Sequence, residues 1–549
     1  MDLPERFDMF WADEIIEDII KKYPNEDSYL ITDWMTTSGH AHIGSLRGVI
    51  IHDLVRRGLA EKNKTAEFQW GYDDFDPMDG LPSYIDKSFL KYMGLPLCNI
   101  PALDGQHKSF AEQYAEEFTE ILDGLGIKAK IVFNSTLYKK GQYNEAIKIV
   151  LDHAKEIRQI YKEISGSDKG ADWYPLQVIC PKCGKIGTTK VIGWDGEKVE
   201  FICEENLVEW AKGCGYKGKI SPFDGNGKMP WKVDWPSKWY ITKTDIEGEG
   251  KDHFAAGGSR DIANAIYHKI FQKEPPYDIR YEHFLIGGSK MSSSKGLGVT
   301  AKDMFDFLPV NILRFLFVRT KYKRAIDFQP EGDTIPLLYD EYDRCAAAFQ
   351  EDPKSDLGCA YYYSEIDPNK SQPAGAEPSG RRPKYLLRFS KIAYMLQMPR
   401  VDIFEYAEKE KGSVLTEIEK QEIENRIKIA KKWLEKFAPE NYKFTIQEKL
   451  PDTAKNLSAQ QKEFLNKILA VIKDVEPVST HPRGGCYSGE ELHKRIHEIK
   501  SEMKIAPRDA FSAIYLTFIG KDSGPQAGWL LASLDKNFVI KRLEEVNHD

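Results

Sequence analysis

Apolar and polar positions follow two alternating periods over the first 164 residues. Short apolar runs typical of strands alternate with longer stretches in which apolar residues recur every three or four positions, as on one face of a helix. The expected strands are 29–33, 67–72 and 131–133, and the expected helices are 46–59, 110–125 and 144–164. This alternation predicts an α/β fold with a parallel sheet, helices on both faces and a ligand crevice at the carboxyl ends of the strands.

The pattern changes twice further along the chain. Residues 165–228 form turns rich in glycine and lysine around four cysteines, which we interpret as an insertion. Strand and helix character returns over 229–325, through 239–241, 262–271 and 284–287. Residues 326–549 are helical in pattern, with expected helices over 336–349, 385–398, 416–437, 459–473 and 489–503.

The composition narrows the class of protein. At 549 residues the chain is long enough for about two to four domains, and 41% hydrophobic with 30% charged residues is typical of a folded globular protein. The sequence contains no apolar run near the ~20 residues of a membrane span and no basic, apolar leader, so we expect a cytoplasmic protein. The net charge of −8 argues against general coating of nucleic acid, but a local basic patch suffices for one RNA partner.

Two short segments carry groups suited to phosphate chemistry. The first, TSGHAHIGS over residues 37–45, follows a strand-like run and opens a helix, so it offers backbone N–H groups and the positive end of a helix dipole. The second, SKMSSSKG over 289–296, offers two lysines with serines between them. His42 and Lys290 are candidates to stabilise charge that grows in a transition state. A capping histidine and a solvated loop are the alternatives, and for His40 the capping or packing role is favoured.

A third segment, EGKDH over residues 249–253, follows a strand-like stretch and precedes glycines and a helix. A short carboxylate at a strand end is suited to binding ribose hydroxyls, as in dinucleotide folds. We favour a nucleotide or amino-acid role for Asp252 and His253 over a structural turn.

Four cysteines lie within 35 residues: Cys180 and Cys183 in a C-x-x-C turn, then Cys203 and Cys214. Four thiolates brought together by a hairpin are typical of a closed tetrahedral zinc site, which leaves no position for catalysis. The sequence therefore predicts structural Zn²⁺. A three-cysteine or lost site is the alternative, because the spacings are irregular.

An aromatic segment, WKVDWPSKW over residues 231–239, surrounds one carboxylate, and RYEH over 280–283 ends the next strand-like stretch. Aromatic faces with a carboxylate suit a cationic ligand. Burial in the core is the alternative, and for Trp239 we favour it.

The two phosphate-type segments resemble the H-x-G-H and K-M-S-K-S signatures of class I aminoacyl-tRNA synthetases. Three further segments, WGYDDFDP over 70–77, YMGLPL over 92–97 and WKVDWPSKW over 231–239, resemble the class I lysyl-tRNA synthetases more specifically. The resemblance covers residues 30–325, and beyond them only helical character is shared. Two positions depart from the signatures: Ser45 stands in place of the second histidine, and Ser293 stands in place of a lysine. Lys295, two residues later, is a candidate to take over part of the role of that lysine.

The resemblance implies a Rossmann-type catalytic domain formed by residues 1–164 and 229–325, a zinc-binding connective insertion over 165–228 and an α-helical anticodon-binding region over 326–549. It implies that lysine is activated by ATP with Mg²⁺ on the phosphates, and that the lysyl group passes to the terminal ribose of tRNA(Lys). His42 and Lys290 become the catalytic residues. The expected ATP-binding residues are Gly39, His42, Gly44, Ser45, Asp252, Lys290, Met291, Ser292, Ser293 and Lys295. The expected lysine-binding residues are Thr36, Thr37, Trp231, Asp234, His253 and Tyr281.

Three other functions remain open at this point. A class I synthetase for arginine or glutamate shares the signatures, although the Asp/Trp set favours a cationic substrate. A small-molecule nucleotidyltransferase shares the ATP chemistry but does not need the long helical region. A non-catalytic tRNA-binding relative is the third. The expected partners are tRNA(Lys), lysine and ATP, with no membrane and a monomeric chain favoured.

Overall fold

The computed structural model describes residues 9–290, 299–366, 385–399, 401–440, 442–474 and 489–548. The chain divides into two compact units. The first comprises residues 1–328 and 348–371, and the second comprises 329–347 and 372–549. Residues 348–366, which the sequence pattern placed with the helical region, therefore return to the first unit.

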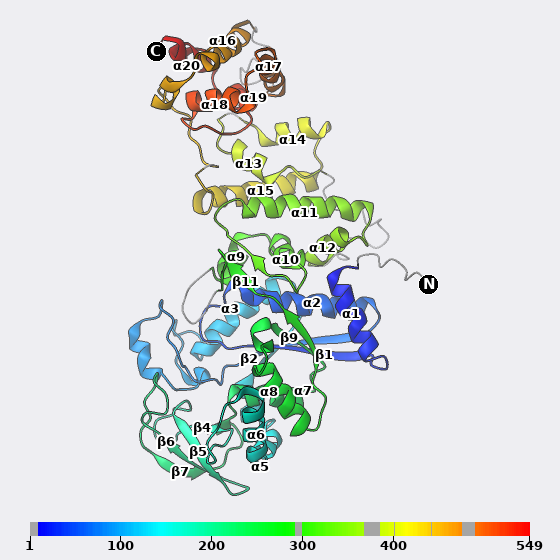
Figure 1. Ribbon diagram of the computed structural model, residues 1–549, viewed down its shortest axis with the longest axis vertical. Helices are drawn as coiled ribbons and strands as arrows, with labels where there is room; N and C mark the ends of the chain where they lie inside the picture. The colour runs from blue at the N-terminus through cyan, green and yellow to red at the C-terminus, as the bar shows by residue number, and fades with distance from the viewer. Residues whose placement is uncertain are drawn as a thin grey trace. The chain divides into compact units, whose positions relative to one another are not determined.

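A parallel sheet of five strands, in the order β10-β9-β1-β2-β3, forms the centre of the first unit (Figure 1). β1 pairs with β2 along its whole length, from Ser28 opposite Thr65 to Met35 opposite Tyr72. The strand order reverses between β1 and β9, where ligands bind in open α/β sheets. The strands are β1 (Ser28–Met35), β2 (Thr65–Tyr72), β3 (Lys130–Phe133), β9 (Ile246–Gly250) and β10 (Tyr277–Tyr281).

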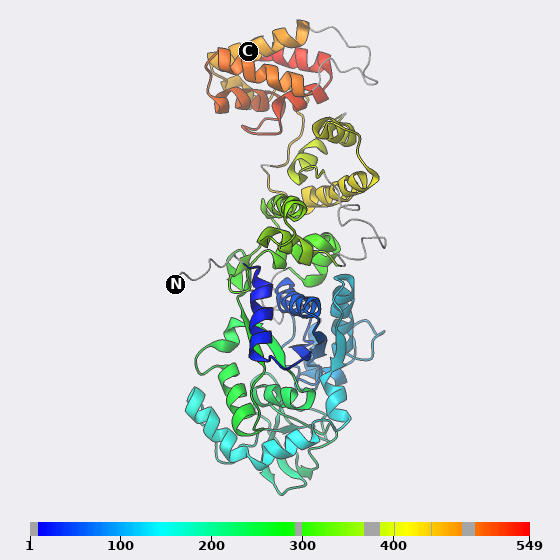
Figure 2. The same cartoon turned by 90° about the vertical axis from the view of Figure 1, so that its right-hand side faces the viewer.

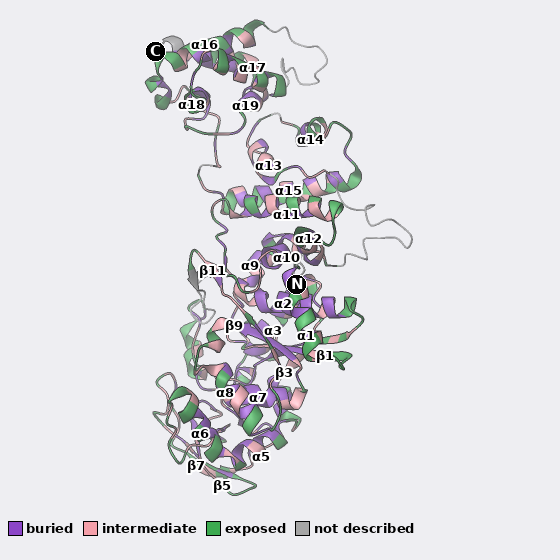
Figure 3. Ribbon diagram, turned by 45° about the vertical axis from the view of Figure 1, so that its right-hand side comes forward, coloured by how far each residue is buried: buried purple, intermediate pink, exposed green. Residues whose placement is uncertain are grey.

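Helices cover both faces of this sheet, as the sequence predicts. Figures 1 and 3 show α2 on one face, with α7 and α8 on the other. α2 is buried along most of its length because it packs on β2, α1 and α10. The helices of the α2 side are α1 (Trp11–Lys22), α2 (Leu46–Glu61), α10 (Val310–Val318) and α12 (Asp356–Ser364). α3 (Phe110–Gly124) starts where the Ser109 side chain accepts from the backbone N–H of Glu112.

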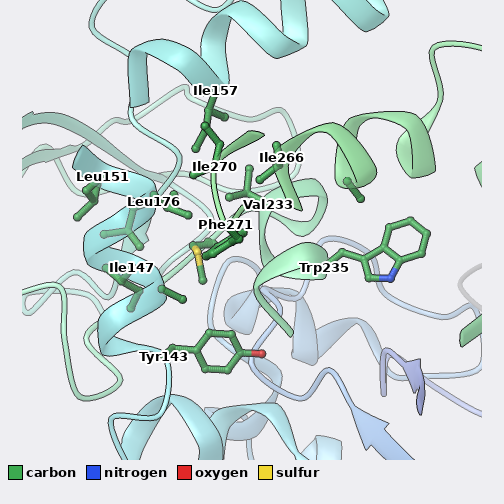
Figure 4. Close-up of a cluster of buried hydrophobic side chains, with 14 of the residues drawn as sticks. Tyr143, Ile147, Leu151, Ile157, Leu176, Val233, Trp235, Ile266, Ile270 and Phe271 are labelled. Carbon is green, nitrogen blue, oxygen red and sulfur yellow. The ribbon is translucent and has the colours of Figure 1, made fainter. Parts of the chain in front are cut away.

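A large hydrophobic core on the α7 face joins four helices (Figure 4) to buried residues of the 165–228 insertion, among them Val178, Val191 and Phe201. Tyr143 and Ile147 meet Val233, Ile266 and Phe271 there. The predicted helix 144–164 is two helices, because the chain turns at His153. These helices are α5 (Asn144–Asp152), α6 (Ala154–Ser165), α7 (Trp231–Thr242) and α8 (Ser259–Lys269), and the short α4 (Asn134–Lys139) precedes them.

The strand predicted over 239–241 is wrong. These residues end α7, in which Trp231, Trp235 and Trp239 recur every fourth position and form one row with ring centroids 5.3 and 5.7 Å apart. A spacing of four is the period of one helix face, and it outweighs the strand propensity of the aromatic residues.

The insertion contains only short antiparallel strands. β4 and β8 pair where the insertion leaves and rejoins the catalytic fold, and β5, β6 and β7 form a separate sheet. Their bounds are β4 (Gln177–Val178), β5 (Thr189–Trp194), β6 (Val199–Cys203), β7 (Lys217–Ile220) and β8 (Gly227–Lys228).

A small three-stranded sheet follows the central one, with β11 between β12 and β13. It leads to α9, which begins in a capping box between Thr300 and Asp303, and then to α10. Arg314 of α10 donates to Asp53 and to the carbonyls of Leu125 and Tyr363, so α12 is fixed to the first unit. The strands are β11 (Phe284–Ile286), β12 (Ser289–Lys290) and β13 (Ile326–Asp327), and α9 is Ala301–Phe307.

The second unit is helical throughout its described residues. α11 and α15 are joined by a buried ion pair between Asp343 and Arg426, and α16 to α20 pack against one another (Figure 2). None of the described helices is long and apolar enough to cross a membrane. The helices are α11 (Thr334–Glu351), α13 (Phe389–Met395), α14 (Ile403–Lys411), α15 (Glu417–Lys436), α16 (Ala459–Asp474), α17 (Gly489–Glu502), α18 (Pro507–Phe518), α19 (Ala527–Ser533) and α20 (Lys536–His548).

Candidate active site

A cavity of about 350 Å³ opens at the carboxyl ends of β1, β9 and β10, where the strand order reverses. Its position agrees with the crevice expected from the sequence. The lining combines carboxylates, imidazoles, one guanidinium and aromatic rings. The lining residues are Asp33, Trp34, Met35, Thr36, Gly39, Ala41, His42, Gly44, Ser45, Arg47, Trp70, Gly250, Asp252, His253, Tyr281, Glu282, His283 and Phe284.

The turn that carries His42 is hydrogen-bonded to the segment that follows the lysine-rich motif. The backbone N–H of Ile43 donates to the carbonyl of Val299 at 3.1 Å, and that of Ala301 donates to the carbonyl of Ala41 at 2.8 Å. The turn that carries His42 is therefore a neighbour of residues 299–301, which follow the lysine-rich motif about 250 residues later in the sequence.

His42 and Lys290 are placed by different elements. His42 immediately precedes the short helical turn η1 (Ile43–Ser45), which leads into α2, and it lines the cavity. Lys290 ends β12, where its backbone lies opposite Leu285 of β11. The predicted residues Met291, Ser292, Ser293 and Lys295 lie outside the described residues.

His40 has a partner away from the cavity. Its Nδ1 lies 2.8 Å from a carboxylate oxygen of Glu117, and this hydrogen bond raises the pKa of His40. The backbone N–H of His40 donates to the hydroxyl of Tyr84. These contacts fit the structural role expected for His40.

Two pairs of titratable side chains meet at the end of β10. Asp252, in the short helical turn η4 (Lys251–Phe254), lies 2.7 Å from Nε2 of His283. Glu282 is paired with Lys251 at 2.6 Å. Asp252 thus stands at the mouth of the crevice, beside the end of β9, where the sequence places a ribose ligand.

Arg47 is a buried cation at the cavity wall. One of its guanidinium nitrogens, Nη2, donates to the carbonyls of Tyr322 and Arg324. The other two, Nε and Nη1, are buried without a hydrogen-bond partner in the described structure. Burial lowers the pKa of Arg47 to about 10, so it still carries a positive charge near neutral pH. The wall therefore carries a buried positive charge beside the cavity.

The predicted lysine-binding residues fall into two groups. Thr36, His253 and Tyr281 line the cavity. Trp231 does not line it, but its ring lies 5.4 Å from that of His253 and is 38% exposed. Thr37 is fully buried outside the lining.

Asp234 lies in a buried charged network that does not line the cavity. Lys228 and Lys238 lie 3.5 and 3.3 Å from its carboxylate, and Tyr138 donates to it. Burial opposes ionisation, but the two lysines outweigh it and hold the pKa of Asp234 below its usual value. This carboxylate already has its cations. Lys238 also lies 4.5 Å above the ring of Trp34, which does line the cavity.

The four cysteines of the insertion meet in one cluster. The sulfurs of Cys180, Cys183, Cys203 and Cys214 all lie within 4.8 Å of one another. The distances of 3.6 Å from Cys180 to Cys214 and 3.7 Å from Cys183 to Cys203 match the ~3.8 Å edge of a tetrahedron with Zn–S bonds of ~2.3 Å. The donor set fits zinc.

Comparison with known proteins gives the family. The family model described as "tRNA synthetases class I (K)" matches residues 9–366. The chain belongs to this family.

Relatives of this class I family match almost end to end. A lysine–tRNA ligase of Methanosarcina barkeri (strain Fusaro / DSM 804) is 35% identical over 98% of both chains. One of Methanocaldococcus jannaschii is 34% identical over 97% of this chain and 99% of its own. Among solved structures, a glutamate tRNA ligase from Elizabethkingia meningosepticum CCUG26117 matches with 11% identity and a TM-score of 0.42, covering 95% of this chain and 99% of its own.

Membership of the class I synthetases excludes the small-molecule nucleotidyltransferase. The sequence reasoning missed Asp33 and Arg47 of the cavity, and it named Glu282 and His283 only within the segment 280–283, without a role of their own. The strand-end position of Asp33, directly before the signature turn, is the signal that could have identified it.

Proposed function

We propose that the chain is a lysine–tRNA ligase, which activates lysine with ATP and transfers the lysyl group to the terminal ribose of tRNA(Lys). The observation that carries the proposal is the pairing of 41–43 with 299–301, which brings the first signature turn beside the residues that follow the second signature, next to a cavity at the point of strand reversal. Relatives bearing this activity in their names align over nearly the whole chain.

The reaction has two displacement steps. The carboxylate of lysine attacks the α-phosphorus of ATP, the bond to pyrophosphate breaks, and lysyl-adenylate forms. A ribose hydroxyl of the tRNA then attacks the carbonyl carbon, and AMP leaves. The protein contributes position and electrostatic stabilisation and forms no covalent bond to substrate.

In this proposal His42 and Lys290 stabilise the charge that develops on the phosphates as pyrophosphate leaves. Gly39, Gly44 and Ser45 line the cavity near the start of η1 and α2, where the positive end of the helix dipole suits the ATP phosphates. Asp252 binds the ribose. Mg²⁺ is expected on the phosphates, held mainly by substrate and water, as is usual for this ion.

The amino-acid pocket is assigned to Thr36, His253 and Tyr281, with Trp231 supporting His253 from outside. Burial lowers the pKa of His253, which favours the neutral ring beside a cationic substrate. Because Asp234 already has two lysine partners, we assign it a structural role. It pairs with Lys238, which in turn lies over the ring of Trp34 in the cavity lining.

The cysteine cluster would hold one Zn²⁺ with four sulfur ligands and no open position, so its part is structural. Ile186 and Gly187, beside the cluster, donate backbone hydrogen bonds to the carbonyl of Gly94. Zinc would thus also support the segment around residue 94. We assign anticodon recognition to the second unit and expect a cytoplasmic monomer.

Pyrophosphate exchange measured with each of the twenty amino acids tests the proposal. Lysine alone should support rapid exchange, and tRNA(Lys) should then be charged. Exchange with arginine or glutamate instead would identify a different class I synthetase. No exchange with any amino acid, with tRNA binding retained, would indicate the non-catalytic relative.

A further inference from the structure

Asp33 is a carboxylate of the cavity wall that has no lysine or arginine partner among the described residues. It stands near the end of β1, its side chain is 14% exposed, and it lines the cavity. Within the described part of the chain its one ion-pair contact is with Nδ1 of His52, at 3.2 Å. The backbone N–H of Trp34 donates to its other oxygen, Oδ1, at 2.8 Å, which fixes the orientation of the carboxylate.

Glu282, another carboxylate of the lining, differs from Asp33 because Lys251 neutralises it. Asp252, like Asp33, contacts a histidine, but it lies in η4 after β9, in the segment that we assign to the ribose. A partly buried carboxylate without a cationic partner destabilises the folded protein, because its desolvation is not compensated. A ligand that brings a positive charge would compensate it.

Asp33 and Tyr281 both approach α2 at Gly48. A Cβ atom placed on Gly48 would lie 2.6 Å from the hydroxyl of Tyr281 and 2.8 Å from Oδ2 of Asp33. Both oxygens therefore lie close to the surface of α2 at this glycine. Aromatic rings of Trp34 and Trp70 complete this part of the lining and suit the methylene groups of an alkylammonium chain.

We propose that Asp33, supported by the Tyr281 hydroxyl, binds the ε-ammonium group of the substrate and so selects a cationic amino acid. This inference rests on the proposed lysine–tRNA ligase function. It moves the specificity-determining carboxylate from Asp234, which is already paired with two lysines, to Asp33. The same negative charge disfavours glutamate, and norleucine, which has the chain without the charge, leaves the carboxylate unpaired.

Asp33→Asn is the central test, because asparagine keeps an acceptor for the Trp34 N–H and removes the charge. In lysine-dependent pyrophosphate exchange the KM for lysine should rise by about 30-fold or more, with the KM for ATP unchanged. The preference for lysine over norleucine should fall by a similar factor. Asp33→Glu keeps the charge and should retain most of this preference.

Glu282→Gln is the matched control, because it removes a lining carboxylate that Lys251 already neutralises; its lysine KM should change far less. Thermal unfolding checks each variant, and Asp33→Ser replaces Asp33→Asn if the latter is unfolded. A lysine KM and lysine-to-norleucine preference that stay at wild-type values in folded Asp33 variants would overturn the inference while leaving the ligase function intact. Failure of the wild-type protein to activate lysine would instead overturn the function itself.

Discussion

Nζ of Lys228 lies 2.8 Å from Oδ1 of Asp76, and Asp76 in turn accepts from the hydroxyl of Thr36 at 3.1 Å. Lys228 is the last residue of β8, where the insertion rejoins the catalytic fold, and Thr36 lines the cavity. The insertion is therefore connected to the cavity lining by the Lys228–Asp76 ion pair and the Thr36–Asp76 hydrogen bond.

Replacing Lys228 by methionine should destabilise the first unit by about 3–5 kcal/mol, because Asp76 and Asp234 lose a buried cation. Urea unfolding followed by tryptophan fluorescence measures this loss. Lys148→Met is the matched control: its pair with Asp152 is exposed, so the change should stay below about 1 kcal/mol. Equal losses for the two variants would contradict a structural role for the buried network.

The pH dependence of lysine binding should follow His253. Burial lowers its pKa, so the ring is neutral at pH 7 and becomes cationic only below its usual value of about 6.5. Protonation places a positive charge beside a cationic substrate, so the KM for lysine should rise as the pH falls from 7 toward 5. His253→Gln should remove this part of the rise. If the KM for lysine had the same pH profile in the wild-type protein and in His253→Gln, the role of His253 in this pH dependence would be refuted.

Removal of His42 or Lys290 should slow the chemical step. A preorganised donor in a site that excludes water contributes about 10²–10³ in rate. His42→Ala and Lys290→Ala should therefore each reduce kcat for pyrophosphate exchange by that factor, with a smaller effect on the lysine KM. His268→Ala, which removes an exposed ring on α8, is the control and should keep the wild-type rate. Near-normal exchange in both variants would end the transition-state assignment.

Lys295→Ala distinguishes two roles for the second lysine of the motif. A milder loss than in Lys290→Ala indicates assistance only. A comparable loss indicates that Lys295 replaces the lysine that Ser293 displaces.

Metal analysis should give about one zinc per chain. Cys180→Ser should lose the metal and destabilise the insertion, because three sulfurs no longer complete the tetrahedron. The exchange rate at saturating substrate should fall much less than the stability. Zinc-free protein with four freely reactive thiols and unchanged stability would exclude the site.

The second unit should be dispensable for adenylation. A protein in which residues 1–328 are joined by a glycine–serine linker to 348–366 retains the carbonyl of Tyr363 that accepts from Arg57 and Arg314. It should keep pyrophosphate exchange and lose tRNA charging. A chain that ends at residue 330 lacks that acceptor and should unfold. Anticodon-dependent charging by the linked protein would contradict the assignment of the second unit.

Much of the site was predictable because its parts have local signatures. The strand–turn–helix around His42 shows in the residue pattern, and the cysteine spacing indicates a metal centre before any coordinates. β9 is harder to predict: its sequence, IEGEG, has little strand propensity, yet it pairs with β1 and β10, and Arg260 of α8 pairs with Glu247 and Glu249 on it. Sheet pairing and ion pairs of this kind leave no periodic pattern in the sequence.

The lysine pocket was less predictable for a related reason. Asp234 lies in an aromatic segment that suggests a cation site, yet the two lysines that contact it come from β8 and from the next turn of α7. Asp33 is one acidic residue near a strand end. Its proposed role as a ligand for the substrate depends on the lack of a lysine or arginine partner among the described residues around it. Which charged side chains pair with one another is decided by the three-dimensional fold, so it could not be predicted from the sequence.

The return of residues 348–366 to the first unit also sets an order of events during synthesis. Arg57 and Arg314 are made long before the Tyr363 carbonyl that completes their hydrogen bonds. Chains grow at ~5–20 residues per second and domains fold as units from the N-terminus. These hydrogen bonds therefore cannot form until the ribosome has made α11 and α12 as well, so we expect the first unit to complete its folding only after part of the second unit has been synthesised.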